Sequence, residues 1–280
     1  MLRILKSGFY TSVQDRGRFG YRDKGVPVSG AMDNLAITTA NDLLENEEDA
    51  AVLEITMTGP TVEFEEHTYI VLAGASMSAT LNNRPVMNYK VYEVTTGDIL
   101  SYGRLEHGFR SYLSVKNGFI TEKVLGSRSF SKAITSVTHL KDRSEIRYDP
   151  CSLFEPKIPE IKIIDSYFDE TALEVTKGPE YEMLENRQLE KIFGSDFSVA
   201  KENNRMAYQL KEVIDGHRKS MLTSATLPGT VQLTPAGKLI ILMKDGQTTG
   251  GYPRILQLTD KAIPILAQKK FGDAISFKLA

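Results

Sequence analysis

A polar, glycine-rich run near the N-terminus holds the residues best suited to chemistry. Residues 12–33 read SVQDRGRFGYRDKGVPVSGAMD and include the carboxamide of Gln14, the carboxylate of Asp15 and the guanidinium of Arg18. Glycine and proline at this density predict a loop with specified turns rather than a helix or a strand. Because arginine offers a fork of donors, the loop could hold a small anion or an amide. A solvated turn with surface ion pairs is the alternative.

A second polar run, DGQTTGGYP, occupies residues 245–253. It follows an apolar stretch with the pattern of a strand, so its polar groups should emerge at a sheet edge. Adjacent glycines let backbone amides approach a ligand and form an anion-binding nest, while Asp245 could orient a water or an amine. The alternative is a hairpin turn in which the glycines serve only the backbone geometry and the polar residues bind no ligand. The candidate binding residues of this run are Thr248, Thr249, Gly250, Gly251 and Tyr252.

A third candidate is the short run GSRS at residues 126–129. Ser127 and Arg128 are hydroxyl-bearing and cationic, which suits a carboxylate or a phosphate, although a surface turn explains them nearly as well. Glu54 lies within an apolar predicted strand, where a buried carboxylate needs a partner such as an arginine. It is either structural or a partner for Arg18.

Several kinds of site are missing from the sequence. It contains neither a GxxxxGK[ST] phosphate-binding loop nor a GxSxG nucleophile elbow. The histidines are scattered without paired ligand spacing, so no metal site is predicted. The single cysteine, Cys151, cannot form an internal disulfide and lies in a proline-rich stretch without an evident catalytic partner.

The composition is that of an ordinary globular protein. With 280 residues, 41% of them hydrophobic, the chain can bury one large core or two modest ones. Its formal net charge of -2 gives no reason to expect nucleic acid or an anionic membrane as a partner. A lone cysteine suits a reducing compartment, and the sequence shows neither a signal peptide nor an apolar run of membrane-spanning length. We therefore expect a cytoplasmic protein.

Most of the chain has the pattern of short strands broken by turn residues. Helical spacing of apolar residues predicts a helix over residues 31–45, and further helices are expected within residues 179–194 and 259–266. The predicted strands are residues 2–5, 51–57, 61–65, 69–73, 91–95, 99–102, 110–115, 161–164, 197–200, 205–210, 230–233, 239–243 and 254–258. The absence of a βαβ rhythm favours curled sheets or barrels.

The second half of the chain repeats the first half faintly but in order. The run TVEF at residues 61–64 compares with TVQL at 230–233, and GDILSY at 97–102 compares with GDAISF at 272–277. Collinear pairs of this kind predict duplicated lobes, although two β-rich domains with similar turns would also explain them. We predict an N-terminal lobe over residues 1–150, a linker over 151–160 and a C-terminal lobe over 161–280. The two glycine-rich loops are expected to line a common cleft.

The opening signature resembles that of a bacterial protein family. The run QD-x-GR-x-GY followed by GVPVSGAMD is similar to the start of the 5-oxoprolinase C subunits, a family also known as KipA-like or allophanate hydrolase subunit 2. The same family is called the biotin-dependent carboxyltransferase family. Further matching blocks are AN at residues 40–41, LEIT at 53–56, GP at 59–60, GSRS at 126–129, PGTVQ at 228–232 and DGQTTGGYP at 245–253.

This resemblance implies a fold and an activity. The fold would be mainly β with a few helices (α+β), in two related lobes that contain cyclophilin-like β-barrels. The activity would be that of one component of an ATP-dependent 5-oxoprolinase, which opens 5-oxo-L-proline to L-glutamate. Because a cyclic amide is a poor electrophile, phosphorylation of its carbonyl oxygen by ATP makes ring opening feasible. Two companion proteins are implied, one KipI-like (the B subunit) and one LamB/YcsF-like (the A subunit), and ATP would be shared with them.

Within that activity, particular residues have expected roles. Asp15 or Asp245 would position water or accept a proton, and Arg18 or Arg128 would bind the substrate carboxylate. Two alternatives stay open: a carboxyltransferase component that uses carboxybiotin, and a non-catalytic KipA-like antagonist of a KipI-like kinase inhibitor. The chain also departs from the family pattern, because residues 135–143 lack its glycine-rich segment and Gly246 replaces a basic residue. These departures leave the choice of substrate open.

Overall fold

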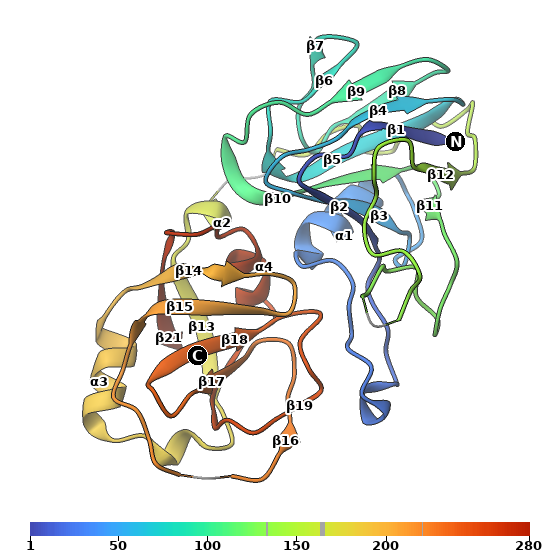
Figure 1. Ribbon diagram of the computed structural model, residues 1–280. Helices are drawn as coiled ribbons and strands as arrows, with labels where there is room; N and C mark the ends of the chain where they lie inside the picture. The colour runs from blue at the N-terminus through green and yellow to red at the C-terminus, as the bar shows by residue number, and fades with distance from the viewer. Residues whose placement is uncertain (133, 163–165, 220) are drawn as a thin grey trace. The chain divides into compact units, whose positions relative to one another are not determined.

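The chain divides into two compact units (Figure 1). A computed structural model describes residues 1–132, 134–162, 166–219 and 221–280. The first unit comprises residues 1–18 and 29–165, and the second comprises residues 19–28 and 166–280. Residues 19–28 were predicted to belong to the N-terminal lobe, but they cluster with the second unit.

The first unit is built from two sheets and one helix. Its seven-stranded sheet has the order β11-β12-β1-β4-β9-β6-β7, and its five-stranded sheet has the order β2-β3-β10-β5-β8. The elements are β1 (Leu2–Lys6), β2 (Tyr10–Gln14), α1 (Asn34–Leu43), β3 (Val52–Thr56), β4 (Thr61–Phe64), β5 (Thr68–Ser76), β6 (Thr80–Leu81), β7 (Arg84–Pro85), β8 (Val91–Val94), β9 (Ile99–Ser101), β10 (His107–Val115), β11 (Phe119–Ile120) and β12 (Glu145–Tyr148).

Three layers result from the way these elements bury their apolar residues. Leu2 and Ile4 of β1 share one buried cluster with Leu53 and Ile55 of β3, so the two sheets pack face to face. A second cluster joins α1 to the other face of the five-stranded sheet, where Val52 lies. Because both faces of this sheet are covered, β3 is buried at every position.

The second unit contains a closed barrel with helices packed beside it. The strand order around the barrel is β13-β20-β17-β18-β15-β14-β21, and parallel pairing of β13 with β21 closes it. The elements are the short helix η1 (Arg22–Lys24), α2 (Ser166–Asp169), β13 (Ala172–Lys177), η2 (Tyr181–Met183), α3 (Asn186–Gly194), β14 (Phe197–Asn203), β15 (Ala207–Val213), β16 (Ser224–Ala225), β17 (Thr230–Leu233), β18 (Lys238–Leu242), β19 (Thr249–Gly250), β20 (Arg254–Leu258), α4 (Ala262–Ala267) and β21 (Ala274–Leu279).

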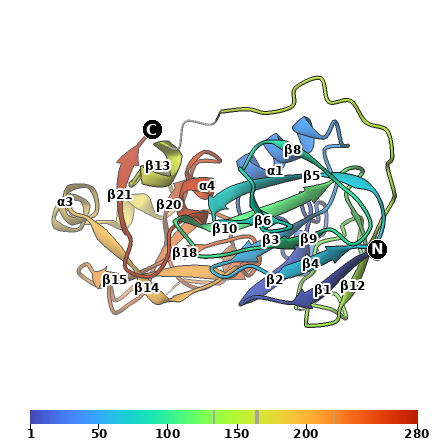
Figure 2. The same cartoon turned by 90° about the horizontal axis from the view of Figure 1, so that it is seen from above.

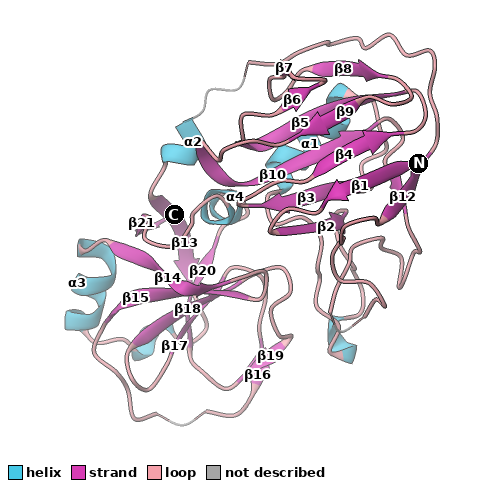
Figure 3. Cartoon of the chain, turned by 45° about the horizontal axis from the view of Figure 1, so that its top comes forward, coloured by secondary structure: helices cyan, strands magenta, loops and turns pink. Residues whose placement is uncertain are grey.

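The predicted fold class is confirmed in its main feature, because strands dominate and helices are few (Figure 3). A closed barrel was expected in each lobe. The described strands of the first unit instead form two sheets, and the closed barrel belongs to the second unit. Within the described ranges, no helix combines the length and the apolar character needed to cross a bilayer.

One predicted loop was partly wrong. The glycine-rich run was expected to be irregular from residue 12, but β2 extends to Gln14 and pairs antiparallel with β3. The apolar alternation of a strand is hidden here because Ser12 and Gln14 are polar and nevertheless fully buried. The irregular segment therefore begins at Asp15.

Helix boundaries follow capping residues that the apolar spacing does not show. Helix α1 begins at Asn34, three residues later than predicted, because the Asp33 carboxylate accepts a hydrogen bond from the Ala36 amide (3.0 Å). Helix α3 begins at Asn186, where Glu185 and Gln188 form a capping box, and it ends at Gly194 as predicted. The strand predicted over residues 161–164 lies partly outside the described residues.

The proline-rich stretch predicted as a linker runs along the first unit (Figure 2). Backbone hydrogen bonds connect Cys151 to His67 and Ile161 to Tyr89. The ring of Phe154 packs against Tyr69 with a centroid distance of 5.3 Å. Within the first unit, this stretch is therefore held by specific contacts.

Candidate functional site

Asp15 lies at the centre of a hydrogen-bonded cluster in the first unit. Its Oδ1 accepts hydrogen bonds from the Gly17 amide (2.8 Å) and from the hydroxyls of Ser127 (2.7 Å) and Ser129 (2.6 Å). Its Oδ2 accepts one from the Arg128 amide (2.6 Å). The aspartate is 3% exposed, so a buried carboxylate here is satisfied by four donors of its own chain. We call this cluster of Asp15 with residues 127–129 the Asp15 clasp.

The predicted basic residues of this region bind backbone carbonyls. Arg18 is fully buried and donates from Nε to the Val124 carbonyl (3.0 Å) and from Nη2 to that of Ser129. Arg128 donates to the carbonyl of Thr121. The Gln14 amide donates to Ser12 Oγ (3.0 Å). The structure thus brings together Gln14, Asp15, Arg18, Ser127 and Arg128, and their contacts hold the turn at residues 126–129 against β2.

A second buried polar cluster surrounds Glu54. Its Oε2 accepts hydrogen bonds from the Met32 amide (2.8 Å) and the Tyr112 hydroxyl (3.0 Å), and its Oε1 lies 3.9 Å from Nε of Arg110. Burial, then the nearby charges of Glu54 and Asp33, raise the pKa of Tyr112 well above its ordinary value. The partner of Glu54 that the structure shows is thus Arg110. In the sequence, Glu54 lies inside an apolar predicted strand. That pattern predicts a cationic partner for the carboxylate, but it does not identify the residue that provides it.

Asp245 forms an ion pair at the surface of the second unit. Nε and Nη2 of Arg205 lie 2.9 Å and 3.3 Å from the two carboxylate oxygens of Asp245, a bidentate arrangement. The Asp245 side chain is 22% exposed, whereas that of Arg205 is 9% exposed. The aspartate is therefore oriented by a guanidinium and still reaches solvent.

Thr226 connects the DGQTTGGYP run to the segment of residues 19–28. Its hydroxyl donates to the Gln247 carbonyl (2.5 Å), and its amide donates to the Thr248 carbonyl (3.0 Å). Its own carbonyl accepts a hydrogen bond from Nη2 of Arg22. The other terminal nitrogen of Arg22, Nη1, is buried and has no partner among the described residues. Burial lowers the pKa of Arg22.

The two adjacent glycines of the run have different surroundings. A Cβ on Gly250 would lie 2.4 Å from Nε2 of Gln232, so the buried Gln232 side chain would have to move to accept any other residue here. A Cβ on Gly251 would meet no atom of the described chain within 4 Å. The bare backbone at Gly251 is thus open on the side where a side chain would project.

Several side chains of this run make no hydrogen bond to the part of the chain that the structure describes. They are those of Gln247, Thr248 and Thr249. Together with the buried Nη1 of Arg22, they are polar groups that the described chain leaves unpaired. We call Arg22, Arg205, Asp245 and residues 247–251 the TTGG site. From the sequence, Asp245, Thr248 and Thr249 were predicted as site residues. Arg22 was noted only as one of the cations of the glycine-rich loop, and Arg205 was not predicted.

The two predicted catalytic aspartates belong to different units, Asp15 to the first and Asp245 to the second. A common cleft for both loops stays a prediction. Across the described ranges, no group of three or more His, Cys, Asp or Glu side chains has the geometry to hold a metal ion.

Comparison with known proteins connects the chain to named relatives. It is 34% identical to the C subunit of 5-oxoprolinase from Escherichia coli (strain K12), over 99% of this chain and 90% of the relative. It is 31% identical to the protein of the same name from Haemophilus influenzae, over 99% of this chain and 91% of the relative. Urea amidolyase of Lachancea kluyveri is 27% identical, and the match covers 98% of this chain but 16% of that enzyme.

A solved structure shows the same fold. The crystal structure of a protein named TTHA0988 superposes with a TM-score of 0.90 over 99% of this chain, at 23% identity. This chain spans 55% of the length of that one. The family model described as "Carboxyltransferase domain, subdomain A and B" matches residues 24–279. The chain belongs to this carboxyltransferase domain family.

Proposed function

We propose that this protein is a subunit of an ATP-dependent 5-oxoprolinase that opens 5-oxo-L-proline to L-glutamate. The proposal rests mainly on the length of the match, which covers nearly all of this chain and nearly all of each relative. Relatives named as the C subunit of 5-oxoprolinase match this chain over 99% of its length and over at least 90% of their own. The urea amidolyase match covers 16% of that much larger enzyme. A chain that corresponds to almost a whole subunit is expected to act as that subunit.

The TTGG site offers groups that this reaction needs. The substrate carries a carboxylate, and a guanidinium is a suitable partner for it. Arg18 and Arg128 donate to backbone carbonyls of the first unit, whereas Nη1 of Arg22 is unused by the described chain. We therefore assign Arg22 to the substrate carboxylate, with the hydroxyls of Thr248 and Thr249 beside it.

Asp245 is the proposed group for water or proton handling. It is fixed by Arg205 and is partly exposed, so it can orient a water or accept its proton. Opening the ring adds this water to the phosphorylated carbonyl carbon, breaks the C–N bond and gives the nitrogen a proton. A second water then releases phosphate from the new carboxyl group, which leaves L-glutamate. The Asp15 carboxylate accepts four hydrogen bonds from its own chain, and we therefore assign it a structural role in the Asp15 clasp.

Companion proteins belong to the proposal because the sequence contains no phosphate-binding loop. ATP would activate the amide carbonyl, and it would be held jointly with the KipI-like and LamB/YcsF-like companions. The proposed location is the cytoplasm. Nothing in the TTGG site opposes an anion, since Arg22 places one unused donor there and Asp245 is already balanced by Arg205.

The test is 5-oxoproline-dependent ATP hydrolysis by the reconstituted complex, with and without this chain. Turnover should require the chain. Asp245→Asn should lower kcat about 100-fold or more, which is the usual contribution of a general acid or base. Arg22→Met should chiefly raise KM for 5-oxoproline, because it removes a contact made in ground and transition states alike.

Matched controls are available on the same unit. Asp260 and Arg218 are exposed and lie outside the TTGG site, so Asp260→Asn and Arg218→Met make the same chemical changes elsewhere. Both controls should retain wild-type turnover. Unchanged turnover when the chain is left out would refute the proposed function, and a fully active Asp245→Asn would refute only the role of Asp245.

The name of the matching family supports a second candidate, a carboxyltransferase component that receives carboxyl groups from carboxybiotin. The urea amidolyase match favours the same reading. Calorimetric titration with biotin separates the two candidates. Saturable binding of biotin that Asp245→Asn weakens would favour the carboxyltransferase; absence of heat at millimolar biotin would favour the 5-oxoprolinase function.

A further inference from the structure

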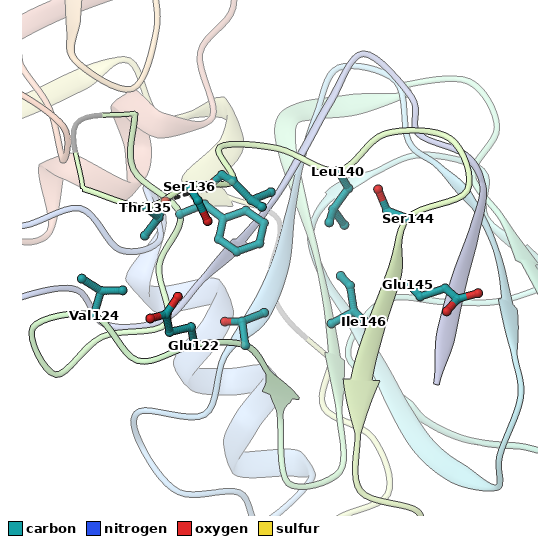
Figure 4. Close-up of a pocket in the computed structure, with 11 residues that line it drawn as sticks. Glu122, Val124, Thr135, Ser136, Leu140, Ser144, Glu145 and Ile146 are labelled. Atoms are coloured by element: carbon teal, nitrogen blue, oxygen red, sulfur yellow. Dashed lines mark hydrogen bonds between the residues drawn. The ribbon is translucent and has the colours of Figure 1, made fainter.

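A cavity of about 400 Å³ lies in the first unit, and no residue of the TTGG site is among those that line it. It is lined by residues 121, 122, 124 and 130 around the turn of the Asp15 clasp, by parts of 135–140, and by 144–146 at the start of β12. Figure 4 shows Glu122, Thr135 and Ser136 on one side of it and Leu140, Ser144 and Ile146 on the other. This volume lies within the usual range of small-molecule sites.

The wall of the cavity is apolar where it meets the core. Phe130, Leu140 and Ile146 are 9%, 4% and 4% exposed, and all three belong to the buried cluster between the two sheets. Val124 and Val137 add further apolar surface. A ligand with a compact apolar body would therefore gain by leaving water for this wall.

The charge on the wall is negative and only partly balanced. The lining contains two carboxylates, those of Glu122 and Glu145, and it contains no lysine, arginine or histidine. Glu145 lies 3.7 Å from Nε of Arg3, a guanidinium that also pairs with Glu63 and Glu65. Glu122 makes no hydrogen bond or ion pair to the described residues. One carboxylate at the rim is thus available to a cation.

We propose that this cavity binds a small ligand with an apolar body and a single positive charge, such as a primary ammonium group. The body would rest on Phe130, Leu140 and Ile146, and the ammonium would lie beside Glu122. Thr121 and Ser136 are also among the lining residues, and the Thr121 hydroxyl donates to the Arg128 carbonyl (3.3 Å). An anionic ligand is disfavoured, since it would bring a negative charge to a wall without cations.

The cavity shares two residues with the contacts that hold the Asp15 clasp. The Val124 carbonyl accepts the hydrogen bond from Arg18 (3.0 Å), and the Phe130 carbonyl accepts one from Gln14 (3.3 Å). The Phe130 amide donates to the Val13 carbonyl (2.9 Å). A bound ligand should therefore slow hydrogen exchange of amides in residues 121–146, which gives a readout of its position.

The experiment is titration of the full chain with three probes of matched shape: 2-phenylethylammonium, 2-phenylethanol and phenylacetate. The ammonium should bind saturably, and the alcohol should bind more weakly by up to about fivefold, the upper end of the usual range for one partly exposed ion pair. Phenylacetate should bind more weakly than the alcohol. The advantage of the ammonium should shrink as salt is added.

Two variants and one control make the result decisive. Glu122→Gln should remove the preference for the ammonium over the alcohol, while Glu47→Gln, which changes an exposed glutamate outside the lining, should keep it. Val137→Trp places a large side chain at a half-exposed lining position (46% exposed) and should abolish binding of all three probes. Equal affinity for ammonium and carboxylate, or exchange protection outside residues 121–146, would overturn the proposal. So would absence of saturable binding in the wild-type chain.

Discussion

Asp15 in the first unit and Asp245 in the second each lead a polar run rich in glycine, yet the two carboxylates are used differently. Asp15 is 3% exposed and receives four hydrogen bonds from its own chain. Asp245 is paired with one guanidinium and is 22% exposed. Near Asp245, Nη1 of Arg22 also has no partner among the described residues.

The difference teaches how to separate a structural loop from a binding loop when their compositions are alike. A carboxylate whose acceptor positions are already filled stabilises its own turn. Binding a ligand needs donors and acceptors that folding has left unused. By this criterion we propose a structural role for the Asp15 clasp and substrate binding for the TTGG site.

The largest effect should come from Gly30→Ala in the first polar run, with Gly251→Ala in the second run as its contrast. A Cβ on Gly30 would lie 2.7 Å from the backbone C and O atoms of Arg16, and φ at this residue is +82°. Gly30→Ala should therefore cost about 3 kcal/mol of unfolding free energy or more, from strain and overpacking together. Gly251→Ala, which meets no atom within 4 Å, should change it by less than about 0.5 kcal/mol.

Urea unfolding of both variants measures this contrast. A stable Gly30→Ala protein would show that the first run is not tightly packed and would remove the distinction between the two regions. A Gly251→Ala protein that folds normally but binds 5-oxoproline poorly would strengthen the distinction between the two regions. The glycine would then be needed for ligand binding and not for folding.

The next largest effect separates the two aspartates directly. Asparagine keeps one acceptor oxygen but turns an NH₂ group toward donors that surround Asp15 on both sides. We expect Asp15→Asn to cost about 2–3 kcal/mol of unfolding free energy, whereas Asp245→Asn, in a partly exposed pair, should cost less than about 1 kcal/mol. Urea midpoints and turnover should be measured on the same samples. An Asp15→Asn chain with wild-type stability and no turnover would mean that Asp15 acts in catalysis.

The smallest effect concerns the support of the TTGG site. Arg254 donates to the carbonyl of Ala225 in β16, which pairs with β19, and it is held by Glu180. Hydrogen bonds from Arg254 lower the pKa of Glu180. Because the folded-state pKa lies below the unfolded value of about 4.3, this pair contributes stability above that pH and loses it as pH falls through the folded-state pKa.

Glu180→Gln therefore should lower stability by at most about 1 kcal/mol near pH 7, and the difference should vanish as pH falls through the lowered folded-state pKa of Glu180. Thermal melts of both proteins between pH 3 and pH 7 provide the comparison. A difference that stays constant over this range would show that the pair does not contribute through its charge.

Local signals in the sequence predicted some elements well. Strands β17 and β20 begin and end where predicted, because apolar residues and flanking glycine or proline mark their limits. Contacts between distant residues could not be predicted in this way. The barrel closes through pairing of Leu173 with Phe277, which lie far apart in the sequence. Strand β2 lacks the apolar alternation of a strand because several of its buried side chains are polar.

For the candidate site, residue types were predictable but their use was not. Asp15 and Asp245 were both identified from charge and glycine density. What separates them is the set of partners that folding supplies, such as Ser127 for Asp15 and Arg205 for Asp245. The hydrogen bond from Arg22 to Thr226 joins residues 204 positions apart, so no local sequence pattern predicts it.

Residues 19–28, which cluster with the second unit, make the covalent path pass between the units three times, at 18/19, 28/29 and 165/166. Severing the polypeptide once within residues 151–160 would therefore leave both fragments carrying pieces of both units. A separately expressed C-terminal fragment would lack Arg22 and should bind 5-oxoproline poorly even when its barrel folds. When the two fragments are co-expressed from a gene split within residues 151–160, binding of 5-oxoproline should return only if the fragments reassemble.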